Sequence, residues 1–369
     1  MLPKLRIAYF AHSLRSDWNN GNAHFLRGLL REMSSLGHEI TVFEPEHEWS
    51  IDNLALEQLG AESLTHFALT YPELNICTYP SGTSDATRET TLSACDIVVL
   101  HEWNPPALAH SLLELRDRLG FRLLFHDTHH RASSSPEQVK LFQIDRFDGV
   151  IAFGEALRSI YMQAFGLSRV WTLHEAADTR VFYPHAMPDK CLDVVWVGNW
   201  GDGERSTEIS EFLLQPASRL GSKRFRVYGV RYPESGLRAL QNAHVEYSGY
   251  LPNLSAPLVY ARSLLTVHIP RQHYVKAMTG IPTIRVFEAL ACGIPLISAP
   301  WDDTEGLFRS HDFCSVKNGD EMTDALNAML HDPESRRLMA ERGLKTVLER
   351  HTCRHRASQL TEICEEVLA

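Results

Sequence analysis

The chain contains 369 residues, of which 44% are hydrophobic and 22% are charged, and its formal net charge at pH 7 is −10. A chain of this length usually forms more than one hydrophobic core, so two domains are expected. The negative charge argues against nucleic acid or an anionic membrane as the main partner. No stretch approaches the roughly 18 consecutive apolar residues that an integral membrane segment needs.

The seven cysteines are scattered and include no Cys-x-x-Cys pair. An odd number of dispersed cysteines indicates a reducing compartment rather than a disulfide framework. The apolar run at residues 6–11 is too short for the core of a signal peptide and is expected to be a buried strand. The protein is therefore expected to be cytoplasmic.

Short apolar runs alternate with helical patterns through the first half of the chain. After the strand at 6–11 and a turn rich in Asn and Gly, residues 24–37 place their apolar side chains on one helical face and end at Gly37. Further strands are predicted at 39–45, 96–101, 122–127, 149–154 and 169–174. Strands that alternate with helices indicate βαβ units and a parallel sheet.

A second series of the same kind begins after residues 178–189, which are polar, contain proline and are predicted to be a linker. A helix ends at Gly293, and the chain from about residue 318 onward is helical and charged. Strands are predicted at 193–200, 225–230, 244–250, 264–270, 294–300 and 313–317. The two series predict two doubly wound α/β domains, with ligands at the carboxyl ends of the strands.

The first candidate site is the turn at residues 16–25, which leads into a helix at Gly21 and Asn22. Free N–H groups at a helix start suit an anion or a sugar hydroxyl. The turn lacks the G-x-G-x-x-G pattern of dinucleotide sites. An ordinary Asn/Gly turn that tolerates positive φ explains the residues equally well.

The second candidate site is FHDTHHR at residues 125–131, which contains His126, Asp127 and His129 at a predicted strand end. Imidazole can orient or deprotonate a hydroxyl group near neutral pH. A zinc site lacks a standard ligand spacing here, and a solvated loop is the other alternative. Glu102 follows a neighbouring strand and is a weaker candidate of the same kind.

The third candidate site is VGNWGDGERSTEI at residues 197–209, where Gly198, Gly201 and Arg205 lie between a strand and a helix. Glycines permit close backbone approach, and a guanidinium beside a helix N-terminus suits a diphosphate. The G-x-x-G-x-G spacing is not the NAD fingerprint, and phosphate binding is favoured over a plain loop.

The fourth candidate site is TGIPTIRVFEALACGIPLISAPW at residues 279–301. A helix opens near Thr283, and Arg285 and Glu288 lie three residues apart on one face of it. In a cleft, Glu288 can bind both hydroxyls of a ribose while Arg285 meets phosphate. The alternative is an ion pair within the helix, which position alone favours.

Two of these segments resemble a known family. RVFEALACGIPLISAP resembles the donor-site segment of GT-B glycosyltransferases of the family 4-like and CgeB-like kind, and HEAADTRVFYP at 174–184 resembles their interdomain passage. The resemblance runs through the whole chain in order. It implies two Rossmann-like domains that face each other across a cleft: 1–182 for the acceptor and 183–350 for the donor. A helix at 351–369 would pack back on the first domain.

The resemblance also implies roles for donor-site residues. Glu288 corresponds to the ribose-binding glutamate, and Arg205 lies within about one position of a phosphate-binding lysine. Pro282, Thr283 and Ile284 take the place of the loop whose backbone amides hold the distal phosphate in the family. The expected donor contacts are Gly198, Asn199, Gly201, Arg205, Thr283, Ile284, Arg285 and Glu288.

On the acceptor side, one of His126 and His129 corresponds to the histidine of the cleft. The expected catalytic residues are His126, His129, Arg205 and Arg285, and the expected acceptor contacts are Gly21, Asn22, Glu102 and Asp127. Two positions depart from the family pattern: Gly280 stands where a second glutamate is usual, and Asn199 stands where an arginine is usual.

The expected function is transfer of a sugar, as a hexosyltransferase, from a nucleotide-diphosphate-sugar such as a UDP-sugar to the hydroxyl of an unknown acceptor. The resemblance implies retention of configuration. No cofactor is expected. The acidic runs at 202–204 and 302–303 are assigned to a phosphate loop and a turn rather than to a metal site. The alternatives are a nucleotide-sugar epimerase and a non-catalytic nucleotide-sugar-binding module.

Overall fold

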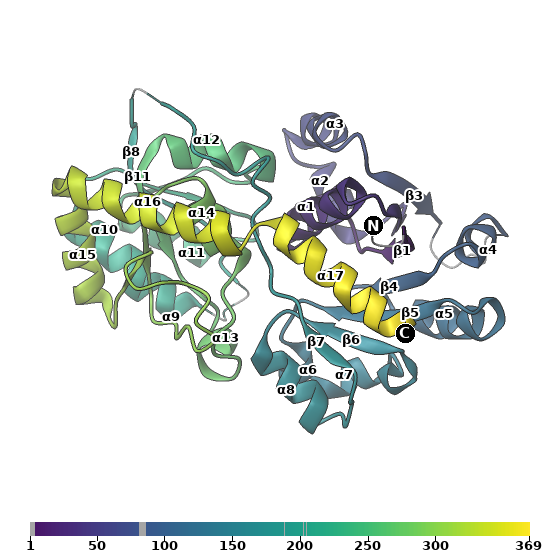
Figure 1. Cartoon of the computed structure of the whole chain (residues 1–369). Coiled ribbons are helices and arrows are strands. Elements are labelled where there is room, and N and C mark those ends of the chain that lie inside the picture. The colour runs from purple at the N-terminus through teal and green to yellow at the C-terminus, as the bar shows by residue number, and fades with distance from the viewer. Residues whose placement is uncertain (1–3, 81–85, 188, 202, 204) are drawn as a thin grey trace. The chain divides into compact units, whose positions relative to one another are not determined.

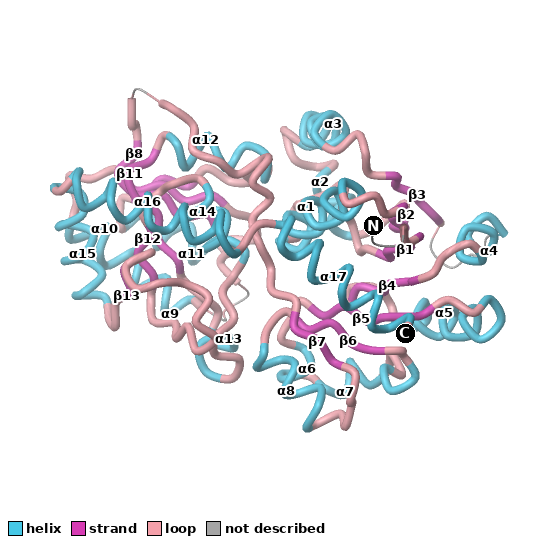
Figure 2. Tube along the Cα trace, in the orientation of Figure 1, coloured by secondary structure: helices cyan, strands magenta, loops and turns pink. Residues whose placement is uncertain are grey.

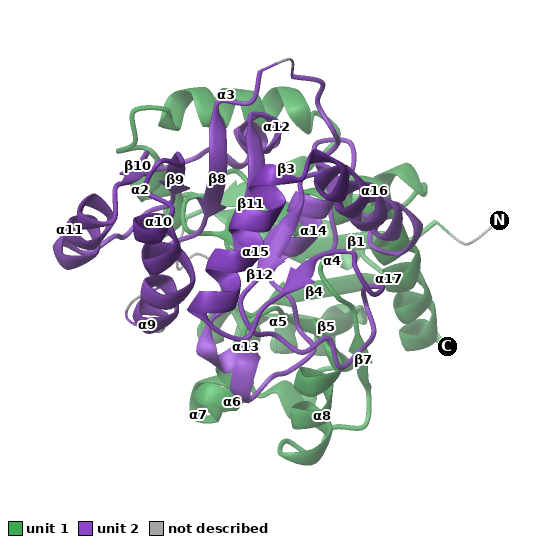
Figure 3. Cartoon of the chain, turned by 90° about the vertical axis from the view of Figure 1, so that its left-hand side faces the viewer, with its two compact units in different colours: residues 1–175, 353–369 green, residues 176–352 purple. Residues whose placement is uncertain are grey.

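The computed structural model describes residues 4–80, 86–187, 189–201, 203 and 205–369. The chain divides into two compact units (Figures 1 and 3). Unit 1 comprises Met1–Glu175 and Cys353–Ala369, and unit 2 comprises Ala176–Thr352. The chain therefore passes between the units after Glu175 and after Thr352, compared with the expected positions 182 and 350.

Unit 1 is built on a seven-stranded sheet in the order β3-β2-β1-β4-β5-β6-β7. All its strand pairs are parallel. The strands are β1 Arg6–Phe10, β2 Glu39–Pro45, β3 Asn75–Tyr79, β4 Ile97–His101, β5 Arg122–Asp127, β6 Gly149–Ala152 and β7 Val170–Thr172. Strand β4 is buried throughout, as expected for a parallel sheet that is covered on both faces.

The helices of unit 1 flank this sheet (Figure 2). They are α1 Gly21–Ser35, α2 Trp49–Leu54, α3 Gly60–Thr70, α4 Ala86–Ser93, α5 Pro106–Leu119, α6 Arg131–Ser134, α7 Pro136–Lys140, α8 Glu155–Gln163 and α17 Cys353–Leu368, with a 3₁₀ turn at Ile144–Arg146. The predicted apolar face of α1 is buried. The C-terminal helix α17 packs against α1, and Nε2 of His38 lies 3.0 Å from Oγ1 of Thr361.

Unit 2 is built on a six-stranded sheet in the order β10-β9-β8-β11-β12-β13, again with parallel pairs. The strands are β8 Leu192–Val197, β9 Phe225–Tyr228, β10 Val245–Tyr247, β11 Ser263–His268, β12 Leu296–Ser298 and β13 Cys314–Ser315. All six overlap segments predicted from the sequence, and β8 and β11 each begin one residue before the predicted start. The two parallel Rossmann-like sheets confirm the expected fold class.

The helices of unit 2 bury apolar side chains against this sheet. They are α9 Ser206–Ile209, α10 Gln215–Arg219, α11 Glu234–Asn242, α12 Ala256–Ala261, α13 Gln272–Lys276, α14 Ile284–Ala291, α15 Gly319–His331 and α16 Pro333–Arg350, with a π-helical turn at Ser210–Leu214 and a 3₁₀ turn at Asn253–Ser255. The core includes Val194, Phe212, Leu265 and Leu326.

The segment predicted as a linker, 178–189, begins with an ordered turn of unit 2. The carbonyl of Asp178 accepts hydrogen bonds from the N–H groups of Val181 and Phe182, and Phe182 is buried. Ala177 pairs with Thr352 in a parallel bridge. The two passages of the chain between the units therefore lie side by side.

Both sheets have a strand order that reverses beside the first strand of the unit, at β1 in unit 1 and at β8 in unit 2. In sheets of this kind ligands bind outside the carboxyl ends of the strands at the reversal. All seven cysteines are free thiols. Within the described ranges, we find no helix with the length and apolarity that crossing a bilayer requires.

Candidate functional site

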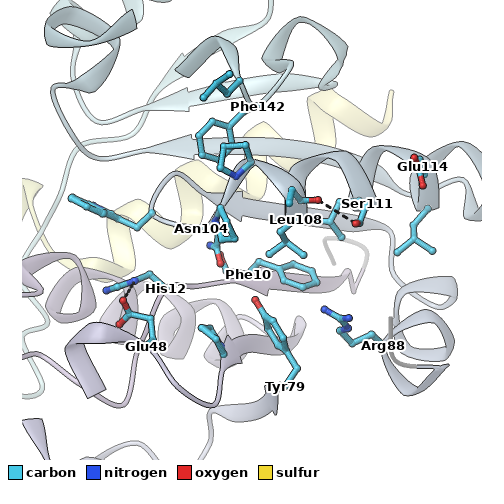
Figure 4. Close-up of a pocket in the computed structure, with 18 of the residues that line it drawn as sticks. Phe10, His12, Glu48, Tyr79, Arg88, Asn104, Leu108, Ser111, Glu114 and Phe142 are labelled. Atoms are coloured by element: carbon cyan, nitrogen blue, oxygen red, sulfur yellow. Dashed lines mark hydrogen bonds and ion pairs between the residues drawn. The ribbon is translucent and has the colours of Figure 1, made fainter. Parts of the chain in front are cut away.

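Unit 1 contains a groove of about 1250 Å³ beside the carboxyl ends of β1, β2 and β4 (Figure 4). One wall comes from α5, where Leu108, Leu112 and Leu115 are spaced along one helical face. Phe10 at the end of β1 and Phe142 contribute further apolar surface. The groove has the size and the mixed lining of a small-molecule site.

A histidine–carboxylate pair lies in the wall of this groove. His12 follows β1, and its Nδ1 is 3.0 Å from Oε1 of Glu48, with side chains 5% and 11% exposed. Glu48 caps the N-terminus of α2 by accepting a hydrogen bond from the N–H of Ser50. Trp49 and Trp103 lie against the imidazole, with ring centroids 5.1 and 6.1 Å away.

Burial sets the protonation of this pair. It lowers the pKa of His12 to about 4, with a further contribution from the Arg131 cation. It raises the pKa of Glu48 to about 7. The other imidazole nitrogen, Nε2 of His12, is buried and has no hydrogen-bond partner among the described residues. The imidazole is therefore neutral at physiological pH.

His126, a predicted catalytic residue, lies inside the sheet. It is fully buried in β5, and its Nδ1 is 2.7 Å from the hydroxyl of Tyr9. Its register partner on β4 is His101, whose Nε2 is 3.0 Å from Oγ1 of Thr128. Burial lowers the pKa of His126 to about 3, so the imidazole is neutral. His126 does not line the groove in this structure.

The two predicted acceptor-side carboxylates, Glu102 and Asp127, belong to a buried polar network and do not line the groove. Arg131 pairs with the carboxylate of Glu102, and Tyr161 donates a hydrogen bond to Asp127. Burial raises the pKa of both carboxyl groups, that of Glu102 to about 8 and that of Asp127 to about 6. Arg131 itself lines the groove, and its guanidinium lies 4.5 Å from the ring centroid of Trp103.

The remaining predicted residues of unit 1 lie outside the groove lining. The ring of His129 contacts that of Trp103, with centroids 5.0 Å apart. Gly21 and Asn22 form the first turn of α1. The side-chain amide of Asn20 holds this turn by donating to the carbonyl of Ser13, 2.9 Å away. The structure thus places these three predicted residues beside the groove wall or on α1.

In unit 2, the loop after β8 folds Arg205 back over the strand end. The guanidinium donates to the carbonyl of Ile269, 3.0 Å away, and lies 5.5 Å from the ring centroid of Trp196. Gly201 has φ +85°, and a Cβ there would lie 2.9 Å from Nε of Arg205. This glycine therefore permits the close approach of the arginine. Two acids of the predicted phosphate loop, Asp202 and Glu204, lie outside the described residues.

The other two residues that were predicted in this loop, Gly198 and Asn199, have structural contacts. A Cβ at Gly198 would lie 2.6 Å from the ring of Trp196. The side-chain oxygen of Asn199 accepts a hydrogen bond from the N–H of Val230 at 2.8 Å. The asparagine therefore joins the loops that follow β8 and β9.

The start of α14 supplies the second half of the unit 2 site. Thr283 is the N-cap, and Ile284 is the first helical residue. Glu288 is 1% exposed. Its carboxylate accepts one hydrogen bond from Arg285 at 2.7 Å and another from Nδ2 of Asn253 at 3.0 Å. In this structure the glutamate is thus held by two protein groups.

Arg205, Thr283 and Arg285 meet around a small cavity of about 20 Å³. His268, at the end of β11, also lines it. Its Nδ1 lies 2.9 Å from Oγ of Ser298, and its Nε2 has no partner among the residues that the structure describes. Burial lowers the pKa of His268 to about 3. Two guanidinium groups beside a helix N-terminus form an arrangement that binds anions.

The acidic pair at 302–303 lies in a turn. Both carboxylate oxygens of Asp303 accept backbone hydrogen bonds, from Leu307 at 2.9 Å and from Phe308 at 2.8 Å. Among the described parts of the chain, no group of three or more His, Cys, Asp and Glu side chains is arranged to hold a metal ion.

Four polar residues of these sites were not predicted from the sequence: His12, Glu48, Asn253 and His268. His12 and His268 each stand at the end of a predicted strand, so the strand pattern alone could have pointed to them. Glu48 and Asn253 come from loops whose partners are distant in sequence. Nothing in their local sequence indicates those contacts.

Comparison with known proteins gives one sequence match and several structural ones. Residues 205–362 match a family model described as glycosyl transferase-like. No curated protein sequence matches the chain. The sequence match begins at Arg205 and includes α14.

Solved structures match both units. HepE from Anabaena, solved in complex with UDP-glucose, aligns with a TM-score of 0.71 at 11% identity over 98% of this chain and 100% of that one. A sucrose-phosphate synthase from Thermosynechococcus elongatus aligns with a TM-score of 0.67 at 14% identity, over 98% of this chain and 99% of that one. A glycosyltransferase from Rickettsia africae aligns with a TM-score of 0.66 at 12% identity, over 99% of each chain. The chain therefore has the fold of the GT-B glycosyltransferases.

Proposed function

We propose that the protein is a glycosyltransferase that moves a sugar, as a hexosyl group, from a UDP-sugar to the hydroxyl of an acceptor. Unit 2 binds the donor, and the groove of unit 1 binds the acceptor. The observation that carries the proposal is the convergence of Arg205, Arg285 and the start of α14 on one cavity, inside the segment that matches the glycosyl transferase-like model.

The groups around this small cavity are of the kind that stabilise a departing diphosphate. Negative charge develops on the leaving group as its bond to the sugar breaks. Preorganised cations and helix N-termini stabilise such charge, usually with the largest single effect on rate. A bound diphosphate competes with Glu288 for Arg285 and with the Ile269 carbonyl for Arg205. Glu288, freed from the arginine, can then accept hydrogen bonds from ribose hydroxyls.

Three finer points belong to the proposal. The donor is a UDP-sugar, which the complex of HepE with UDP-glucose supports. Transfer is independent of a metal ion, because the arginines neutralise the diphosphate, and no organic cofactor takes part. Configuration is retained, as the resemblance to CgeB-like and family 4-like enzymes implies. The protein acts in the cytoplasm.

A donor panel tests the proposal against its alternatives. UDP-, GDP-, ADP- and TDP-glucose are titrated by calorimetry, and each is then incubated with the protein while free nucleotide and sugar isomers are measured. The proposal predicts binding of a UDP-sugar and slow release of UDP. An isomerised sugar without released nucleotide would indicate an epimerase. Binding with neither product would indicate a non-catalytic module, and no binding of any donor would refute the proposal.

A further inference from the structure

The groove of unit 1 has an apolar middle and a different polar group at each end. Figure 4 shows Arg88 on one side of the view and His12 on the other, with Phe10 and Tyr79 between them. Leucines of α5 and the ring of Phe142 also line the groove. A ligand that fills the groove therefore contacts mainly aromatic and aliphatic surface, with its two ends in different polar surroundings.

Arg88, on α4, is supported by an aromatic ring. Its guanidinium carbon lies 4.8 Å from the centroid of the Tyr79 ring at the end of β3, and Tyr79 is buried. The part of the chain that the structure describes offers Arg88 no carboxylate partner. Stacking on a ring face leaves the N–H donors of a guanidinium available for a second partner. Arg88 can therefore bind an anionic group of a ligand in the groove.

Two further arginines that line the groove already have carboxylate partners. Arg118 pairs with Glu89 at 2.8 Å, and Arg131 pairs with a buried carboxylate. Glu114 is exposed on α5, and Figure 4 shows it apart from Arg88. An anionic ligand at Arg88 therefore complements a cation without breaking an ion pair. This charge complementarity selects a ligand with an anion at that end over a neutral one.

We propose that the acceptor is an amphipathic alcohol with an oxyanion at the end remote from its hydroxyl, and that Arg88 binds this oxyanion. The inference rests on the proposed function and names the class of acceptor. The apolar body of the acceptor lies against Phe10, Tyr79 and the leucines of α5. A guanidinium binds a carboxylate or a phosphate through two parallel hydrogen bonds. With the oxyanion at Arg88, the hydroxyl lies at the end of the groove that contains His12.

Calorimetry with the full chain and no donor tests the binding. The first probe is a biphenyl with a hydroxymethyl group at one end and a carboxylate at the other. Its methyl ester is the neutral probe, and the matching phosphonate distinguishes the two kinds of oxyanion. At least one charged probe should bind about 10-fold or more tightly than the ester, as expected for a hydrogen bond between charged groups. The single-ring acid, 4-(hydroxymethyl)benzoate, should bind about 10-fold or more weakly than the biphenyl acid, because it buries one ring fewer.

Variants of Arg88 separate its charge from the shape of the groove. Arg88→Gln should lower the affinity for the charged probes to that for the ester. Arg88→Lys should keep part of the preference, since lysine retains the charge but not the planar fork. The matched control is Arg169→Gln, because Arg169 also lies over a ring, that of Trp171, but outside the groove lining. Leu108→Gln, in the apolar wall, should weaken binding of the acid and the ester by a similar factor.

Equal affinity of the wild type for the acid, the phosphonate and the ester would overturn the proposal, as would a preference that survives Arg88→Gln or no binding of any probe. With the UDP-sugar selected by the donor panel, the preferred probe should be glycosylated at its hydroxyl. Tight binding without transfer, while UDP is still released, would overturn its role as acceptor. Absence of UDP-sugar binding and turnover would instead refute the proposed function, and the probe titrations would be unaffected.

Discussion

At Gly280 the backbone has φ +93°, and a Cβ would lie 2.4 Å from Oγ1 of Thr304 and 3.0 Å from Cγ of Glu305. This is the position at which the resembled family usually has a glutamate. Both the left-handed backbone and the crowding by the side chains of Thr304 and Glu305 disfavour a side chain at this position. The departure from the family pattern is therefore built into the local backbone rather than being a simple replacement.

Substitution of Gly280 by alanine should destabilise unit 2 for two reasons. Positive φ strains any L side chain, and the methyl group meets Thr304. Gly249→Ala is the matched control in the same unit, because Gly249 has φ +68° with nothing within 4 Å of the added Cβ. Urea unfolding should show Gly280→Ala to be less stable than the control by about 1–3 kcal/mol, the usual cost of overpacking. Equal stability would show that the 304–305 turn yields freely.

Glu288 is the residue whose proposed role differs most from its contacts in the structure. Glu288→Gln should weaken UDP binding by about 10-fold or more, the value of a hydrogen bond to a charged group. The melting temperature should change little, because glutamine keeps the hydrogen bond from Asn253 and the Arg285 side chain is 27% exposed. Calorimetry with UDP measures the effect.

Glu334→Gln is the control for Glu288, since Glu334 forms an ion pair of the same i,i+3 spacing with Arg337 on the surface of α16. It should leave UDP affinity unchanged. If Glu288→Gln behaves in the same way, Glu288 is a structural partner of Arg285 and does not contact the ribose.

Among the elements, strands with continuous apolar runs were predictable and the edge strand β3 was not. In β4 every residue is buried, so the run IVVL is visible in the sequence. In β3, by contrast, only Tyr79 is buried, and the sequence NICTY lacks a pattern. An edge strand of a parallel sheet is covered less, so its residues are not selected for apolar character. The same reasoning explains why the partly exposed helices α2 and α3 were not predicted.

The C-terminal helix α17 stabilises unit 1 through its buried face. Leu360 is 2% exposed and Leu368 is 39% exposed on the same helix. Leu360→Ala should lower the free energy of unfolding by about 2–5 kcal/mol, as expected for a large-to-small change in a core. Leu368→Ala should change it by roughly 0.5 kcal/mol or less. Equal effects in urea unfolding would show that α17 is not docked on unit 1.

At the scale of the whole chain, the sequence predicted the sites in part. The structure places Arg205, at the start of α9, and Thr283 and Arg285, at the start of α14, around one cavity, because the loops after parallel strands gather at one edge of the sheet. Their role in donor binding stays a prediction. His126 also lies at the end of a strand, but its side chain points into the core. Because this strand is buried on both faces, the alternation of side chains does not show from the sequence which of them face a site. The pairing of His12 with Glu48 joins a loop after β1 to a helix cap and leaves no local pattern.

The most direct test of the account follows the sugar itself in the presence of excess EDTA. The protein is incubated with a UDP-sugar labelled in the sugar and with an aromatic alcohol, and labelled products and UDP are quantified together. The account predicts that label enters a new glycoside with an equal amount of UDP, at a rate that EDTA does not change. Label that remains on the nucleotide, or transfer abolished by EDTA and restored by manganese, would contradict it.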